Sequence, residues 1–253
     1  MVWIMLLLGL VQGLTEFLPV SSSGHLTLFS GLFGKLTKAQ TLSAELAVHV
    51  GSSIAVMVIY RKKIFSMLKK GNRKYIFYLI LASIPAGIVG VLFHAQLESL
   101  FGGGSVGFGF LFTAVLLLIT QTMARQQTGE SLSYKTALSM GLMQAVAIIP
   151  GLSRSGSTVF GGTLAGGNRE EVADFSFLMS VPVILGGALY QCLFHGGGGL
   201  SFPLLGLGVV SAFFASFVAL NLMKRVIARA RYTGFIVYLT ALGVATLLFR
   251  FAI

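Results

Sequence analysis

Two short polar stretches interrupt an otherwise apolar chain, and they hold the residues that could do chemistry. The first motif (residues 12–25) carries Gln12, Glu16, Ser21, Ser22, Ser23 and His25; the second motif (residues 150–158) carries Ser153, Arg154, Ser155 and Thr158. Carboxylates, imidazoles and hydroxyls can act as bases, nucleophiles or metal ligands. An arginine among serines and glycines suits phosphate oxygens. Together, the two motifs indicate chemistry on a phosphorylated compound.

The second motif repeats part of the first at an offset of 132 residues. This offset superimposes identical residues at several positions: Gly9 and Gly141, Leu10 and Leu142, Gln12 and Gln144, Ser21 and Ser153, Ser23 and Ser155, Gly24 and Gly156. One copy adds an acid and a histidine, and the other adds an arginine. We therefore expect the two motifs to meet at one shared site, where two facing cradles of donors would suit an anion with two phosphates.

The reactive groups allow more than one assignment. His25 is a candidate nucleophile or general base, because the pKa of an imidazole lies near neutrality. Ser22 is an alternative nucleophile, with His25 as its base. Glu16 could bind a divalent cation, or could orient and deprotonate His25 or a serine. A structural ion pair between Glu16 and Arg154 is the simplest alternative to any of these roles.

The remaining candidates surround these groups. Phosphate binding is assigned to Arg154 and to five hydroxyl-bearing residues: Ser21, Ser23, Ser153, Ser155 and Thr158. Glu16 with Gln12 could hold Mg²⁺ or Ca²⁺ together with substrate phosphates, because these cations prefer oxygen ligands. Glu45 and His49 share one face of the next apolar segment and could complete the pocket, although a buried, hydrogen-bonded Glu45 is an equal alternative.

The composition places these motifs in a membrane. Hydrophobic residues make up 55% of the 253 residues and charged residues only 10%, whereas a soluble domain has roughly 25% charged residues. The net charge is +11, and the basic residues that produce it are grouped between apolar segments. This grouping is typical of cytoplasmic loops rather than of a nucleic-acid surface. The firmest such loop covers residues 61–74, with seven basic residues.

The apolar segments predict an all-α polytopic membrane protein with a single membrane domain, residues 1–253. Six of them are long enough to span a bilayer: residues 42–60, 75–93, 106–123, 175–194, 202–223 and 232–249. Two more, residues 2–34 and 136–167, are broken by the motifs, so we expect re-entrant helical hairpins. Each half, residues 1–124 and 136–253, then has one hairpin and three spans, which makes the halves inverted repeats with a shared midplane site.

The motifs resemble those of the undecaprenyl-diphosphate phosphatase family, also known as the bacitracin-resistance proteins. Gln12-Gly-Leu-Thr-Glu16 with its Ser/His continuation is similar to the family's (Glu/Gln)-x-x-x-Glu segment, and Pro150-Gly-Leu-Ser-Arg154-Ser-Gly-Ser-Thr158 is similar to its Pro-Gly-x-Ser-Arg-Ser-x-x-Thr signature. The resemblance covers essentially the whole chain. One departure is Gln12, where many relatives have a second Glu.

The resemblance implies hydrolysis of undecaprenyl diphosphate, a C55 polyprenyl diphosphate, to the monophosphate and phosphate, with a divalent cation. It also implies a bacterial cytoplasmic membrane, a site opening to the outer face, carrier recycling for peptidoglycan and other envelope polymers, and bacitracin resistance. The expected partners are the lipid substrate and the bilayer, with no nucleic acid; a homodimer is left open. The inverted repeats also allow a polyprenyl-phosphate flippase or anion carrier, which would need no nucleophile.

Overall fold

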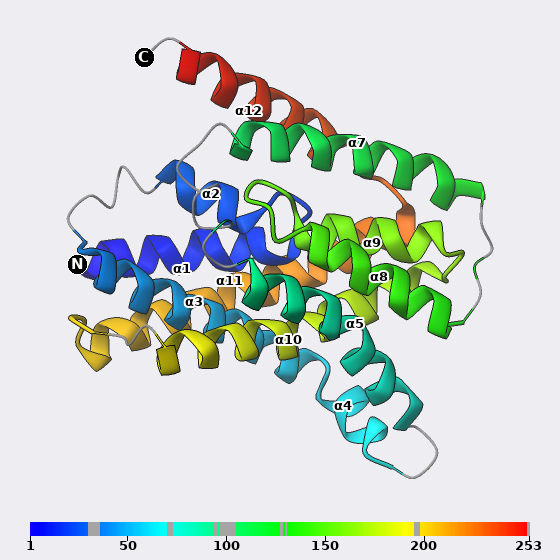
Figure 1. The fold of residues 1–253 in the computed structure, drawn as a ribbon, viewed down its shortest axis with the longest axis horizontal. Coiled ribbons are helices and arrows are strands. Elements are labelled where there is room, and N and C mark those ends of the chain that lie inside the picture. Colours follow the sequence, from blue (N-terminus) through cyan, green and yellow to red (C-terminus); the bar gives the residue numbers. More distant parts are fainter. Residues whose placement is uncertain are drawn as a thin grey trace.

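The computed structural model describes residues 1–29, 36–69, 73–93, 96, 105–126, 129, 131–194 and 198–251. These residues form eleven helices and no strand (Figure 1). The helices are α1 (Val2–Phe17), α2 (Ser22–Phe29), α3 (Lys38–Ile59), α4 (Arg61–Met67), α5 (Arg73–Leu92), α7 (Ser105–Gln126), α8 (Tyr134–Val146), α9 (Arg154–Leu164), α10 (Arg169–Phe194), α11 (Phe202–Arg229) and α12 (Thr233–Phe251). The all-helical prediction is confirmed for this part of the chain.

Five of the described helices are long and apolar enough to cross a membrane, namely α3, α5, α7, α10 and α11. The sixth predicted span corresponds to α12, whose apolar part, Thr233–Phe249, is shorter. At 1.5 Å per residue, the 19 residues of α12 reach about 28 Å, close to the thickness of the hydrocarbon core. A polytopic membrane protein therefore fits the structure.

Two helix boundaries differ from the sequence-based expectation. The span predicted at 175–194 begins earlier in the structure: residues 169–174 form the first turns of α10, because the Asn168 side chain accepts hydrogen bonds from the backbone N–H groups of Glu170 and Glu171 and so caps the helix. The basic loop at 61–74 contains the short helix α4. Residues 70–72 of this loop, and residues 30–34 of the first predicted hairpin, lie outside the described residues.

The repeated glycines allow two equivalent close helix contacts. A Cβ atom added to Gly9 would lie 2.7 Å from the Gly208 carbonyl oxygen, so only glycine lets α1 approach α11 this closely. The matching Gly141 does the same for α8 on α5, where a Cβ atom would lie 2.7 Å from the Ala82 carbonyl oxygen. Small residues at helix interfaces are the usual means of tight packing in membranes. The two contacts fix the positions of α1 and α8, which lead into the two motifs.

A second layer lies across this core. Helices α7 and α12 run side by side along one edge of the molecule, and α2 lies between them and α1 (Figure 1).

At the end of the bundle near α4, Asp174 accepts hydrogen bonds from Tyr60 and Lys63, both at 2.7 Å. Burial of the phenol and the neighbouring Asp174 carboxylate raise the pKa of Tyr60 far above its usual value. This cluster ties α10 to the α3–α4 junction.

Candidate functional site

Serine caps start the helix after each motif turn. Residues 18–21 separate α1 from α2, and the Ser21 hydroxyl accepts a hydrogen bond from the Gly24 N–H at 3.3 Å. Ser153 caps α9 in the same way, accepting from the Gly156 N–H at 3.2 Å. Both helices therefore begin inside the motifs, at Ser22 and Arg154, because a serine before the first turn satisfies a free backbone donor. Ser21 has a positive φ of 66°, a strained conformation that is common at functional sites.

The two motifs contact each other directly, as predicted. The Ser155 hydroxyl of the second motif donates to the Leu18 carbonyl oxygen of the first at 3.0 Å. Arg154 Nη2 donates to Glu16 Oε1 at 2.6 Å, across 138 residues of sequence. The ion pair named above as the simplest alternative is thus present. Its side chains are 16% and 7% exposed for Arg154 and Glu16, respectively.

Glu16 is the centre of the site. Its other oxygen, Oε2, accepts hydrogen bonds from the Ser22 hydroxyl at 2.6 Å and from Gln12 Nε2 at 2.8 Å. A short hydrogen bond from a hydroxyl to an ionised carboxylate is a strong one. Glu16 is therefore placed to accept the Ser22 proton.

Arg154 has donors left over after pairing with Glu16. Its Nη1 donates to the Ser176 carbonyl oxygen at 3.2 Å, and its guanidinium lies 5.9 Å from the centre of the Phe17 ring. These hydrogen bonds use two of the five N–H groups of a guanidinium. The side chain is thus held in a fixed orientation and can still donate to another anion.

The other predicted phosphate-binding residues all have protein partners in the structure. Ser21 pairs with Ser23, and Ser153 pairs with Ser155. The Thr158 hydroxyl lies 2.7 Å from the Ser176 hydroxyl. A hydroxyl donates one hydrogen bond and accepts up to two, so these partners leave some capacity, and phosphate binding by these residues stays a prediction.

The His25 ring hydrogen-bonds to neither Glu16 nor Ser22. Its Nδ1 lies 2.8 Å from the Ser21 carbonyl oxygen, and its Nε2 lies 2.6 Å from the Tyr238 hydroxyl of α12. Since a carbonyl can only accept, Nδ1 carries the hydrogen, and in the neutral ring Nε2 accepts from Tyr238. The expected pairing of His25 with Ser22 or Glu16 is therefore absent from the structure, because both ring nitrogens have other partners.

Glu45 and His49 lie on α3 and line a cavity of about 710 Å³ together with residues of α5 and α10, most of which are apolar. His49 Nδ1 lies 2.7 Å from the Glu45 carbonyl oxygen, and His49 is near enough to Glu16 for an electrostatic interaction. Because Glu16, Ser22 and Arg154 do not line this cavity, a role of Glu45 and His49 in the site stays a prediction.

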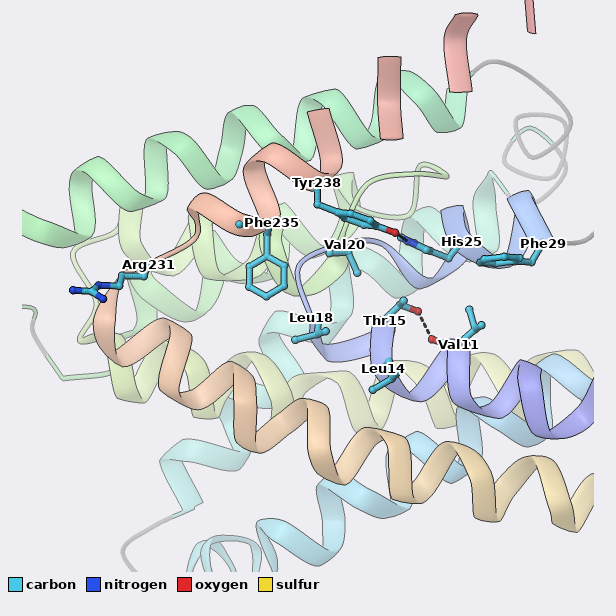
Figure 2. Close-up of a pocket in the computed structure, with 11 residues that line it drawn as sticks. Val11, Leu14, Thr15, Leu18, Val20, His25, Phe29, Arg231, Phe235 and Tyr238 are labelled. Carbon is cyan, nitrogen blue, oxygen red and sulfur yellow. Dashed lines mark hydrogen bonds between the residues drawn. The ribbon is translucent and has the colours of Figure 1, made fainter. Parts of the chain in front are cut away.

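A second cavity, of about 460 Å³, lies on the other side of the first motif; we call it the groove. Its lining comes from α1, α2, α12 and the turns before α2 and α12. Figure 2 shows His25 and Tyr238 meeting end to end above α1, with Phe29 beyond them and Phe235 and Arg231 towards the other end. Apart from His25, Tyr238, Thr15 and Arg231, its lining is apolar.

Three residues of the site could not be predicted from the sequence. Tyr238 reaches His25 across 213 residues, Thr113 accepts a hydrogen bond from the Ser153 N–H, and Ser176 contacts both Arg154 and Thr158. Each comes from a helix that reads simply as an apolar span. Their positions follow from helix packing.

Hard oxygen ligands are available beside Glu16. The Gln12 Oε1 atom is buried and has no hydrogen-bond partner. Within the described residues, no group of three or more His, Cys, Asp or Glu side chains could hold a metal by itself. Gln12 and Glu16 therefore fit a cation that completes its coordination with substrate oxygens.

The whole chain is similar to known proteins. The bacitracin resistance protein BacA family matches residues 5–245. An undecaprenyl-diphosphatase of Christiangramia forsetii is 36% identical over 98% of this chain and 97% of its own length. Those of Parabacteroides distasonis and Bacteroides fragilis are each 39% identical over 96% of both chains. With the motifs, the helical membrane fold and these relatives in agreement, the chain belongs to the bacitracin resistance protein BacA family.

Proposed function

We propose that this chain is a membrane phosphatase that hydrolyses undecaprenyl diphosphate to undecaprenyl phosphate and inorganic phosphate. Relatives that match this chain over nearly their full lengths carry the name undecaprenyl-diphosphatase. The bond that breaks joins the bridging oxygen to the terminal phosphorus, and the prenyl monophosphate leaves with that oxygen. Water supplies the oxygen and the proton that complete the phosphate.

The observation that carries the mechanism is the contact between Ser22 and Glu16. In our proposal the Ser22 oxygen attacks the terminal phosphorus as Glu16 accepts its proton across 2.6 Å. Glu16 then returns that proton to the Ser22 oxygen when water hydrolyses the phosphoserine. His25, the other candidate nucleophile, has its Nε2 lone pair engaged by Tyr238, so attack by His25 would first require this hydrogen bond to break.

Arg154 and two helix starts bind the phosphates in this proposal. A phosphoryl transition state is stabilised chiefly by positioning and by positive charge on its oxygens. Arg154 is the first residue of α9, so its guanidinium and the N-terminus of α9 lie together. The N-terminus of α2, at Ser22, lies in the facing motif. Helix N-termini favour anions, which supports two phosphate positions between the motifs.

Glu16 and Gln12 would hold a divalent cation, Mg²⁺ or Ca²⁺, in the same site. The unpartnered Gln12 Oε1 supports this assignment. When bound, the cation neutralises charge on the substrate phosphates. Because Gln12 stands where many relatives have a Glu, this chain would bind the cation with one carboxylate.

Phosphate release tests the proposal. Purified protein in detergent should release phosphate from undecaprenyl diphosphate, and Ser22→Ala, Glu16→Gln and Arg154→Ala should each lower kcat by about 10²-fold or more. Ser201→Ala is the matched control, because Ser201 is exposed and its side chain makes no capping hydrogen bond. Full activity of Ser22→Ala with loss in His25→Ala would reassign the nucleophile to His25.

The cellular role follows from the substrate. We place the enzyme in the bacterial cytoplasmic membrane, with its site open to the outer face, where it would recycle the carrier lipid for envelope polymers and confer bacitracin resistance. The basic segment around α4 would be cytoplasmic by the positive-inside rule. Cysteines introduced near α4 and labelled from one side of intact cells would test this orientation.

We also propose that the two halves are inverted repeats with re-entrant hairpins at α1–α2 and α8–α9. The pairwise packing supports this, because α1 packs on α11 as α8 packs on α5, and α3 packs on α11 as α10 packs on α5. The same symmetry keeps a flippase or anion carrier as the alternative function. Lipid translocation in vesicles that persists without hydrolysis, and in Ser22→Ala, would favour the alternative.

A further inference from the structure

A phenylalanine ring lies against the guanidinium of Arg154. The Arg154 Cζ atom lies over the Phe17 ring, 5.9 Å from its centre. Phe17 follows Glu16 in the chain and is the last residue of α1, so its ring is held next to the ion pair. A guanidinium within about 6 Å of a ring centre is attracted by the negative face of the ring. The contact therefore adds a cation–π interaction to the two hydrogen bonds of Arg154.

The Phe17 ring is fixed by its own surroundings. Phe17 and Phe177 of α10 are both fully buried, and their rings meet at 85° with 5.8 Å between the ring centres. Helix α10 also supplies the Ser176 carbonyl oxygen that accepts a hydrogen bond from Arg154. The guanidinium thus has two supports besides Glu16, one from α1 and one from α10, and neither of them is a charged group.

The proposed reaction needs a support of this kind. When Glu16 accepts the Ser22 proton, its carboxyl group becomes neutral, and the attraction that holds Arg154 to it falls. Charge on the phosphate oxygens is greatest in the same step, so the guanidinium must then stay in place. A carbonyl or carboxylate would use an N–H group of Arg154 to hold it, whereas a ring face holds the cation and takes none. The donors of Arg154 therefore stay available for phosphate.

We propose that Phe17 is a positioning residue for the reaction, because its ring holds the Arg154 guanidinium against the substrate phosphates while Glu16 is protonated. The assignment rests on the proposed function, since it is attack by Ser22 that protonates Glu16. Phe17 touches no reacting atom and acts through Arg154. The alternative is that Phe17 only fills the core between α1 and α10.

Fluorination of the ring separates these two roles. Fluorine draws electron density out of the ring face, so mono-, di- and trifluorinated phenylalanine at position 17 weaken the cation–π attraction stepwise and leave the ring almost unchanged in shape. Phe175 is the matched control, because it is equally buried and no lysine or arginine lies over its ring within the described part of the chain.

We expect kcat for phosphate release from undecaprenyl diphosphate to fall about two- to thirtyfold across the series at position 17, the range for one cation–π contact. KM should stay nearly constant, because Glu16 is ionised and holds Arg154 when the substrate binds. The same series at position 175 should leave kcat unchanged. A constant kcat at position 17, or an equal fall at both positions, would assign Phe17 to packing and overturn the proposal.

A double-mutant cycle shows whether the ring acts through Arg154. In the Arg154→Ala background, the series at position 17 should leave the residual kcat unchanged, because the ring then has no cation to hold. A fall in kcat as large as that in the native background would overturn the proposal, since the ring would then act through another group.

A binding measurement gives a readout that needs no turnover. Glu16→Gln carries a neutral side chain like that of the protonated Glu16, so Arg154 is then held by the ring and the Ser176 carbonyl. Isothermal titration with methylenediphosphonate, an uncleavable diphosphate analogue, at one Mg²⁺ concentration should show binding about two- to thirtyfold weaker with trifluorinated phenylalanine at position 17 than with phenylalanine. Equal binding would overturn the proposal. If the wild-type protein releases no phosphate from any prenyl diphosphate, the proposed function fails, and this titration still decides whether the ring holds Arg154.

Discussion

Removing Arg154 should destabilise the protein because it leaves Glu16 as a buried, uncompensated charge. In Arg154→Ala, Glu16 Oε1 loses the only partner that the structure gives it, while Oε2 keeps Ser22 and Gln12. Breaking a buried ion pair from one side costs about 3–5 kcal/mol. For a chain of this size, that cost corresponds to a fall in Tm of roughly 6–20 °C.

A double variant separates the charge from the loss of packing. Glu16→Gln/Arg154→Ala removes both charges, so it should recover most of the stability that Arg154→Ala loses. The measurement is the fraction of monodisperse protein that survives heating in one detergent, resolved by size-exclusion chromatography. Intrinsic fluorescence would report poorly, because Trp3, the sole tryptophan, is 81% exposed.

Arg154→Lys tests the proposed role of the Arg154 guanidinium in catalysis. Lysine keeps the charge near Glu16 but lacks the planar fork that can bind Glu16 and a phosphate together. Tm should stay within a few degrees of the wild-type value, while kcat should fall by about 10²–10³-fold. An Arg154→Ala protein as stable as the wild type would refute the buried-charge reasoning, and an Arg154→Lys protein with full activity would refute the need for a bidentate guanidinium.

Three further predictions concern other contacts. Tyr238→Phe removes the donor to His25 Nε2 and should cost about 1 kcal/mol of stability while kcat stays near the wild-type value, since the proposed mechanism gives His25 no step; a fall in kcat of about tenfold or more would show that His25 takes part in the reaction. Gln12→Glu places a second carboxylate beside Glu16 and should lower the Mg²⁺ concentration for half-maximal activity, measured by titration after chelation; a higher requirement would contradict this site. Asp174→Asn weakens the contacts of Tyr60 and Lys63 and should cost about 1–3 kcal/mol of stability, measured by thermal unfolding, with little change in kcat, because Asp174 makes no hydrogen bond to a residue of either motif among the described residues.

The helices were predictable because they depend on local sequence. The meeting of the two motifs was predictable because the repeat places them at equivalent positions in the two halves. Long apolar runs specify spans whatever they pack against. The repeated Gly9 and Gly141 mark equivalent places in the two halves, and the structure shows that both permit close helix contacts. The span predicted at 175–194 begins earlier in the structure, at Arg169, because the charged residues after the Asn168 cap are helical but carry no apolar signal of a span.

The partners within the site were not predictable to the same extent. The sequence could place His25 near Ser22 and Glu16, but not show that the ring faces α12, because the direction of a side chain depends on which helix packs beside it. Ser21 and Ser153 were interpreted only as phosphate ligands, whereas they also cap helices. A serine before a helix is a capping signal that the glycine-rich motif obscured.

One arginine can serve as a structural partner and as a phosphate ligand, and the charges of the site support our proposal that a divalent cation assists it. Glu16 and Arg154 nearly neutralise each other in the structure. A terminal phosphoryl group would add about −1.5 to −2 charges near neutral pH. In a site with little water, such an excess of negative charge is costly unless a cation accompanies it. The need for a divalent cation would therefore arise from the same ion pair that holds the two motifs together.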